Sequence, residues 1–292
     1  MLSASKTIQK RSLTSKLEVE RKFVPTPFLT KHAADLSKTN NLLARTENAT
    51  SNLTLTDLPR KRITDKYFDI KGEFERRGIW IRWRKEQVTK PDGTDAAPSQ
   101  GVWEAKVKRG GDYLNSQFKE VQGRDAIEEL MVEAGVGDSI FDLRFELGFM
   151  ADRISWAIKE DDSVQNSGNN AAMTVVLDTI TASLEGPNGD HPKYFTHQVG
   201  ELELEKVVTT DSGKGDEHEK ICALEIRRMN EQLATFMAAH PDLFAGKGFP
   251  VGKMTAYINH KEELSARAWK ANEPGRIANM SEVKWEREFN GK

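Results

Sequence analysis

The sequence has one cysteine, Cys222, in 292 residues. A single cysteine cannot form an internal disulfide, and it cannot supply a cysteine-based zinc site. Its expected place is a small core position on a helix. No segment approaches the ~20 consecutive apolar residues of a membrane span, and the N-terminus lacks the apolar stretch of a secretory signal. These absences predict an intracellular protein, with the cytoplasm as its expected location.

The sequence also lacks an excess of positive charge, since its formal net charge is −2 at pH 7. Proteins that bind nucleic acid or membrane through bulk electrostatics usually carry a clear positive excess, so we expect neither partner. Any anion site must then be a local concentration of Lys and Arg. With 37% hydrophobic and 30% charged residues, the composition is that of a globular protein, which we expect to be a monomer.

Acidic residues are absent from the first sixteen positions, which contain Ser, Thr, Lys and Arg. This composition predicts a flexible tail over residues 1–16, and it also weakly resembles a mitochondrial presequence. The mitochondrion is therefore the alternative location. A single domain is expected over residues 17–270, followed by a second tail over residues 271–292.

Many segments alternate apolar and polar residues with a period of two, the pattern of strands with one buried face. They are Leu17–Phe23, Lys66–Asp69, Gly78–Glu86, Val102–Arg109, Gln117–Val121, Arg144–Met150, Arg153–Lys159, Met173–Ile180, Val199–Val208 and Met254–Ile258. Helical spacing is found in Thr30–Lys38, Arg124–Glu133 and Glu217–His240. Polar breakers such as Asn40–Arg62 predict loops. This pattern predicts an α+β, mainly β fold, with an antiparallel sheet or barrel and helices packed outside.

The charged side chains of four predicted strands sort by sign along one face. Alternate residues of a strand share a face and lie roughly 6.6 Å apart. The face-sharing sets are Glu18, Glu20 and Lys22; Trp80, Arg82 and Arg84; Glu104, Lys106 and Lys108; and Glu201, Glu203 and Glu205. For any one strand, a solvated outer face explains the pattern. Across the four strands, the separation of carboxylates from cations favours a shared ligand.

Neighbouring carboxylates on one strand face need a compensating charge. Two carboxylates ~6.6 Å apart repel by roughly 2.5 kcal/mol at an effective dielectric of ~20. Oxygen-only ligands select a hard divalent cation such as Mg²⁺, Mn²⁺ or Ca²⁺ over zinc. Cationic strands facing the same space would hold the oxygens of a polyphosphate, and the metal would join phosphate to carboxylate. The strands therefore predict a site for a metal-chelated polyphosphate.

Two common ligand-binding motifs do not fit the sequence. In GKGFPVGKM, Lys247 stands where a P-loop needs glycine, and Met254 stands where it needs Ser or Thr. The six histidines show neither HExxH nor paired metal spacing. The predicted site therefore depends on carboxylates, Arg and Lys.

The segment EVERK at Glu18–Lys22 matches the ExExK signature of the CYTH, or triphosphate tunnel metalloenzyme, family. Six further landmarks follow in order: WIRWR, VWEAK, DRISW, VLDT, GELELE and VGKMTAY. Together they span about Leu17 to His260, and they resemble the thiamine triphosphatase branch more than other branches. The resemblance implies a closed antiparallel eight-stranded tunnel barrel and a magnesium-dependent hydrolase.

The resemblance also implies roles for the matching positions. As metal ligands, for one or two Mg²⁺ ions or for Mn²⁺, it implies Glu18, Glu20, Asp178, Glu201 and Glu203. As substrate contacts it implies Lys22, Trp80, Arg82, Arg84, Lys106, Arg153 and Lys253, of which Lys22, Arg82 and Arg84 would be catalytic. The indole of Trp80 either attracts a thiazolium cation, by roughly 0.5–2 kcal/mol, or packs the barrel mouth.

One position departs from the resembled pattern. Thiamine triphosphatases often have two acids in the strand of Asp178, and here Val176 replaces the first. We expect a thiamine-triphosphatase-like hydrolase that releases the terminal phosphate of thiamine triphosphate and leaves thiamine diphosphate. The alternatives are an inorganic tripolyphosphatase or another triphosphatase of the same fold, and a catalytically weak polyphosphate-binding protein, which Val176 favours.

Overall fold

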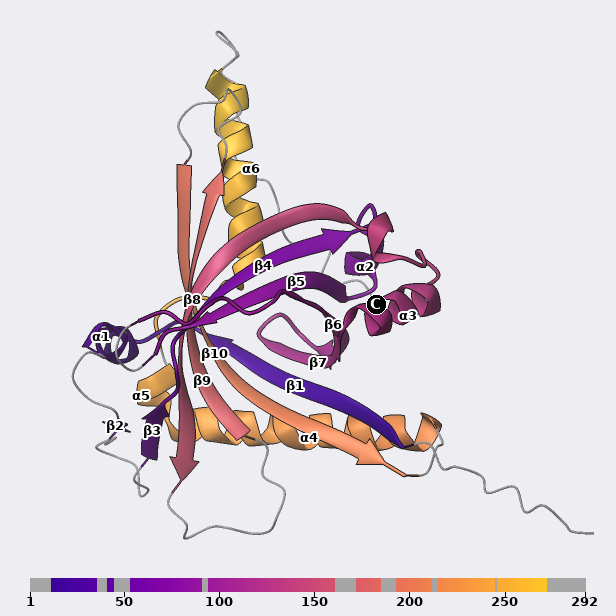
Figure 1. Cartoon of the computed structure of the whole chain (residues 1–292). Helices are drawn as coiled ribbons and strands as arrows, with labels where there is room; N and C mark the ends of the chain where they lie inside the picture. The colour runs from indigo at the N-terminus through magenta and orange to yellow at the C-terminus, as the bar shows by residue number, and fades with distance from the viewer. Residues whose placement is uncertain are drawn as a thin grey trace, which may run out of the picture.

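The computed structural model describes residues 12–35, 41–44, 53–90, 94–160, 172–184, 193–211, 215–244 and 246–271. At its centre, eight antiparallel strands form a closed barrel, and helices pack around it (Figure 1). The fold expected from the sequence, α+β and mainly β with a closed eight-stranded barrel, is confirmed.

Several strands follow one another directly along the chain, which is typical of antiparallel sheets. The strands are β1 (Leu13–Phe23), β2 (Asn41–Ala44), β3 (Leu53–Asp57), β4 (Lys61–Asp69), β5 (Ile79–Val88), β6 (Val102–Gly111), β7 (Asn115–Gln122), β8 (Arg144–Glu160), β9 (Ala172–Leu184) and β10 (Lys193–Thr210). The helices are α1 (Pro27–Asp35), α2 (Glu73–Arg76), α3 (Arg124–Ala134), α4 (Gly215–Ala239), α5 (Pro241–Phe244) and α6 (Lys253–Ala271), with a 3-10 turn at Ile140–Asp142. Within the described part of the chain, no helix is both long and apolar enough to cross a membrane.

The barrel closes through β8. Its strand order is β8, β4, β5, β6, β7, β1, β10, β9 and back to β8. One edge of β8 pairs with β4, and residues Met150–Ala157 pair with β9. The hairpin of β2 and β3 extends the sheet beyond β4, because β3 pairs with the last residues of β8. Closure leaves these eight strands without a free edge and encloses their inward face.

The two faces of the barrel strands differ in chemistry, as β1 shows. Leu17 and Val19 point outward into an apolar core shared with α4, and both are fully buried. Glu18 and Glu20 alternate with them and therefore point into the barrel. Helix α4 lies along the outside of β1 and β10 (Figure 1). The main hydrophobic core is thus outside the barrel, and the inward face of β1 carries charged groups.

Two smaller cores hold the other helices against the sheet. Helix α3 buries Ile127 and Met131 in a core with outward-facing residues of β5 and β6. Helix α6 buries Ala256 and Tyr257 in a core with residues of β4, β8, β9 and β10. This contact brings the first residue of α6, Lys253, to the barrel.

Two expectations from the sequence are wrong. The strand expected at Met254–Ile258 lies in α6. Met254, Tyr257 and Ile258 also fit the i, i+3, i+4 spacing of a helix, and a short apolar run does not distinguish the two structures. The loop expected at Asn40–Arg62 contains β2, β3 and the start of β4.

The other strand and helix predictions are confirmed with shifted bounds. The strands expected at Arg144–Met150 and Arg153–Lys159 form the single strand β8. Strand β1 begins at Leu13, so residues 13–16 belong to the barrel and not to a tail. Cys222 lies buried on α4, as expected. The tail expectations for residues 1–11 and 272–292 lie outside the described residues.

The outer core can be tested on α4, where Leu233 is 0% exposed and Leu224 is 43% exposed. Leu233→Ala removes buried contacts and leaves a cavity, so the free energy of unfolding should fall by about 2–5 kcal/mol. Leu224→Ala, the matched control, should change it by less than about 0.5 kcal/mol. Urea unfolding followed by circular dichroism measures both, and equal small losses would contradict this placement of the core.

Candidate active site

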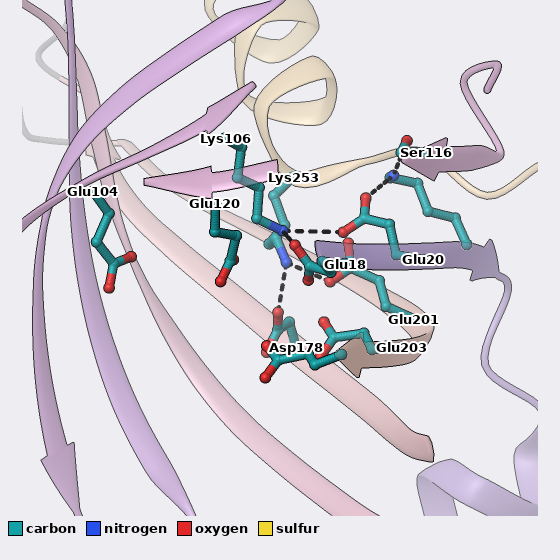
Figure 2. A network of polar contacts seen from close by, with 12 residues as sticks. Glu18, Glu20, Glu104, Lys106, Ser116, Glu120, Asp178, Glu201, Glu203 and Lys253 are labelled. Atoms are coloured by element: carbon teal, nitrogen blue, oxygen red, sulfur yellow. Dashed lines mark hydrogen bonds and ion pairs between the residues drawn. The ribbon is translucent and has the colours of Figure 1, made fainter. Parts of the chain in front are cut away.

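Acids and cations from all eight barrel strands and from α6 line the interior, and Figure 2 shows part of this set. The acids are Glu18, Glu20, Asp65, Glu104, Glu120, Asp178, Glu201 and Glu203. The cations are Lys22, Arg82, Arg84, Lys106, Arg153 and Lys253. Hydrogen bonds and ion pairs join them across neighbouring strands. The structure therefore brings together every charged residue for which the sequence predicts a role.

Glu18, Glu20 and Glu203 converge on one point of the interior. Glu20 stands opposite Glu203 in the pairing of β1 with β10, and Glu18 shares the same inward face. One oxygen of each carboxylate lies within 4.8 Å of the others. Glu18 Oε2 is fully buried, and Lys106 Nζ is its ion-pair partner. Three converging carboxylate oxygens fit a hard divalent cation such as Mg²⁺ or Mn²⁺.

The charge of these carboxylates depends on their burial. Burial raises the pKa of Glu18 to about 8 and that of Glu203 to about 7, and repulsion from neighbouring carboxylates adds to both shifts. Burial also acts to raise the pKa of Glu20, but the Lys106 and Lys22 ammonium groups outweigh it and hold that pKa below its ordinary value. Crowded buried carboxylates do not all ionise without a cation. Without metal, the group therefore holds a proton near neutral pH.

Lys106 and Lys22 supply positive charge to the same group. Lys106 Nζ lies 2.5 Å from Glu18 Oε2, at ion-pair distance, and 3.2 Å from Glu20 Oε2. Lys22 Nζ lies 2.5 Å from Glu20 Oε1 and donates to Ser116 Oγ at 3.3 Å. An anionic ligand that binds these lysines would leave the carboxylates available to a metal.

Asp178 and Glu201 lie near this group, but their carboxylates are paired with the side chains of Arg153 and Lys253. Arg153 donates two hydrogen bonds to Asp178, at 2.8 and 2.7 Å. Lys253 Nζ donates to Asp178 and to Glu201, both at 2.7 Å (Figure 2). Burial acts to raise the pKa of Asp178, but the Arg153 guanidinium and the Lys253 ammonium hold it well below its ordinary value. The five predicted metal ligands therefore fall into a converging group of three and a cation-paired group of two.

Lys253 reaches the interior from the start of α6, not from a strand. The loop before it packs closely on β1. A Cβ atom at Gly246 would lie 2.0 Å from the carbonyl oxygen of Val24, and one at Gly252 would lie 3.1 Å from Lys22 Cε. Glycine at these two positions lets the loop approach β1 and so places the Lys253 ammonium beside the interior carboxylates.

Arg82 and Arg84 are held by acids on the neighbouring strands. Arg84 donates to Asp65 from Nε at 2.7 Å and from Nη2 at 2.6 Å. Arg82 directs two nitrogens at a single oxygen of Glu104, Oε2, from Nε at 3.0 Å and from Nη2 at 2.8 Å. Bidentate pairs fix the plane of a guanidinium. Both arginines are therefore oriented in the interior before any ligand binds.

Asp65 has no place among the predicted site residues, although the alternation of its strand contains the signal. The pattern places a strand at Lys66–Asp69, whereas β4 begins at Lys61 and Asp65 shares one face with the buried Ile63 and Tyr67. Burial acts to raise the pKa of Asp65, and the adjacent guanidinium groups lower it instead. An acid on an otherwise apolar strand face must have a charged partner.

Trp80 and Val176 mark places where the charged lining becomes apolar. Trp80 shares the inward face of β5 with the two arginines, and its ring meets that of Phe118 edge to face, with centroids 5.7 Å apart. Val176 is buried, opposite Glu201 on β10 and Ser155 on β8. No second acid therefore replaces the carboxylate that the resembled pattern has at position 176.

The interior carries more acid than base. Among the described residues, the eight carboxylates named above face the six cations and Lys16, which pairs with Glu120 at 2.6 Å. A free polyphosphate would bring several negative charges close to these carboxylates in an enclosed space, and such repulsion is strong at low dielectric. The lining therefore fits a polyphosphate that enters with divalent cations.

Fold and interior together define a closed antiparallel barrel whose lumen is lined by paired acids and cations around a candidate metal site. Neither a model of a known protein family nor a curated protein matches the chain. Among solved structures, an adenylyl cyclase candidate from Hippeastrum, described as having a dominant triphosphatase activity, has 12% sequence identity and a TM-score of 0.42, and the match covers 84% of this chain and 96% of that one.

Two further structures are similar to the chain. An adenylate cyclase candidate from Bacillus halodurans has 12% identity and a TM-score of 0.32, over 74% of this chain and 91% of that one. The Mediator head module of Schizosaccharomyces pombe matches at 10% identity with a TM-score of 0.35, over 77% and 95% of the two chains. These likenesses are too distant to carry an argument about function, so the proposal below depends on the interior itself.

Glu203 should give the metal-free protein a characteristic pH dependence. Its pKa of about 7 in the folded state lies above the ordinary 4.5, so between these values the folded protein holds a proton that the unfolded chain has lost. The free energy of unfolding in EDTA should therefore fall as the pH rises through this window. Glu203→Gln should remove part of that slope, as measured by urea unfolding at pH 5, 6 and 7.

Glu231→Gln is the matched control, since Glu231 is an exposed acid on α4. It should leave the slope unchanged. An identical slope in the wild type and in Glu203→Gln would show that the interior carboxylate does not hold the proton.

Proposed function

We propose that the chain is a metal-dependent hydrolase that releases the terminal phosphate of a small triphosphate, with thiamine triphosphate as its preferred substrate. The observation that carries the proposal is the convergence of Glu18, Glu20 and Glu203 inside a barrel that also holds six cations. Carboxylate oxygens suit a magnesium ion, and Arg and Lys suit phosphate oxygens. Enclosure directs both sets toward one ligand.

The proposed chemistry is in-line attack of water on the terminal phosphorus. A bond forms between water oxygen and phosphorus, the bond to the bridging oxygen breaks, and its electron pair leaves with the diphosphate while water gives up a proton. Arg82, Arg84 and Lys106 would stabilise the charge that develops on the phosphoryl oxygens. A magnesium ion held by the carboxylate group would supply further charge neutralisation. Such transfers depend on positioning and electrostatics, so they need no nucleophilic Ser or Cys.

The remaining cations would position the rest of the triphosphate. Lys22 lies at the end of the carboxylate group, and Arg153 and Lys253 lie around Asp178. In this proposal Asp178 holds Arg153 and Lys253 in place and is a weaker candidate for a metal ligand than Glu203. This assignment agrees with Val176, which leaves the β9 part of the interior with a single acid.

Trp80 supports thiamine triphosphate over inorganic tripolyphosphate. It precedes the two arginines on the inward face of β5, so an organic group attached to phosphates held there would meet the indole. A thiazolium ring carries a permanent positive charge and would gain cation–π attraction there. Inorganic tripolyphosphate would gain nothing from this residue.

Two other functions remain as alternatives. A tripolyphosphatase or other triphosphatase would use the same interior without the contact to Trp80. A polyphosphate-binding protein without turnover is favoured by Val176, because the loss of one acid weakens metal binding at β9.

Alanine variants of Glu20 and Arg84 test whether the interior performs the reaction. Each change removes an interior charge, so kcat/KM for phosphate release should fall by about 100-fold or more. Glu219→Ala and Arg228→Ala, which remove exposed charges from α4, should leave it within about twofold. Circular dichroism establishes that each variant is folded. Near-normal turnover in either interior variant would remove the barrel lumen from consideration.

A substrate panel tests the preference among triphosphates. Phosphate release is measured from thiamine triphosphate, tripolyphosphate and ATP, each with magnesium and with excess EDTA. We expect the highest kcat/KM with thiamine triphosphate and no release in EDTA. The highest value with tripolyphosphate would support the first alternative, and tight binding without release would support the second.

A further inference from the structure

A cavity of about 460 Å³ lies between the β4–α2–β5 region and α6. Its apolar walls include Tyr67, Trp80, Leu147, Tyr257 and Ile258. This volume lies within the range of small-molecule sites, which are mostly apolar with a few polar groups. The cavity is therefore large enough for an organic group and has walls that suit one.

The cavity adjoins the charged interior through Trp80 and Tyr67. Trp80 is two residues from Arg82 on the inward face of β5, a separation of roughly 6.6 Å. Tyr67 stands opposite Arg82 in the pairing of β4 with β5. A group joined to phosphates held at the arginines would thus enter the cavity directly.

Three exposed carboxylates from three separate elements form the rim of the cavity. Glu75 comes from α2, Glu146 from β8 and Glu262 from α6. Within the described part of the chain, no hydrogen bond or ion pair satisfies these three carboxylates. A fourth acid, Asp69, differs because its oxygens accept backbone N–H groups at the start of α2. The lining also includes one cation, Lys261.

We infer that this cavity binds a flat, positively charged organic group of the substrate, and that Glu75, Glu146 and Glu262 select for its positive charge. The inference rests on the proposed function and identifies which class of triphosphate the site prefers. Cations inside the barrel can bind the phosphates, and carboxylates surround an apolar space next to them. A ligand with an anionic tail and a cationic ring matches both ends.

Other triphosphates match only one end. Inorganic tripolyphosphate leaves the cavity empty and is repelled by the acids at its rim. A triphosphate with a neutral base can fill the space but gains no charge attraction. Each exposed carboxylate contributes little by itself, but three around one apolar cavity act in the same direction, and the indole of Trp80 adds cation–π attraction.

A triple variant neutralises the rim without removing side-chain volume. Its substitutions are Glu75→Gln, Glu146→Gln and Glu262→Gln. The matched control makes the same change in net charge at exposed acids on α3 and α4, away from the cavity. Its substitutions are Glu129→Gln, Glu133→Gln and Glu231→Gln. Both proteins are compared with the wild type at constant magnesium, after thermal unfolding has shown equal stability.

The rim variant should separate the two substrates. The KM for thiamine triphosphate should rise by roughly tenfold with little change in kcat, the combined effect of three exposed charges. The kcat/KM for tripolyphosphate should stay the same or increase, because repulsion at the rim is gone. The control variant should behave as the wild type with both substrates. A fall by the same factor for both substrates, or no change in the KM for thiamine triphosphate, would overturn the inference.

Binding of thiamine itself separates this inference from the proposed function. Titration calorimetry or ligand-observed NMR measures the affinity of each protein for thiamine, the cationic group without phosphates. Weaker binding to the rim variant than to the control supports the cavity even if no protein releases phosphate, in which case only the hydrolase proposal fails. Equal affinities in all three proteins would refute the cavity and leave the hydrolase proposal intact.

Discussion

Charge balance inside a closed barrel is the constraint on which this structure depends. Moving an ion from water into a protein interior costs several kcal/mol even after relaxation, and an unpaired buried charge is strongly destabilising. The bidentate pairs of Arg84 with Asp65 and of Arg153 with Asp178 meet this constraint, and Lys253 meets it by contacting two acids. The charged part of the interior therefore holds its shape through ion pairs, while folding energy comes from the apolar cores.

The balance is least complete where Glu18, Glu20 and Glu203 converge. Two of these groups have raised pKa values because burial and mutual repulsion disfavour their charged forms. Local conflict of this kind, in a structure that is otherwise consistent, tends to mark a functional site. A ligand that brings divalent charge would relieve this repulsion. Part of the free energy of binding would therefore come from removing an unfavourable interaction that the unliganded protein already contains.

The sequence predicted the barrel strands well because a period of two assigns each side chain to a face. The same rule identified the inward charges of β1, β5, β6 and β10 without any knowledge of pairing. It could not predict which charges meet, since partners depend on strand register. Asp65 lay outside the expected strand, and the pairing of Asp178 with Lys253 depends on α6, whose start resembled a strand. Long-range contacts of this kind leave no trace in local periodicity.

The pairing of β1 with β10 joins Leu13–Phe23 to Gly200–Thr210, segments from distant parts of the chain. Ring closure therefore comes late in folding, because the entropy of so large a loop opposes it before the contacts form. The interior ion pairs join side chains of neighbouring strands around the ring, so we expect all of them to be formed only when the ring is complete. Interactions that form this late slow unfolding more than they accelerate folding. The ion pairs of the lumen should therefore lower the unfolding rate and prolong the lifetime of the native state.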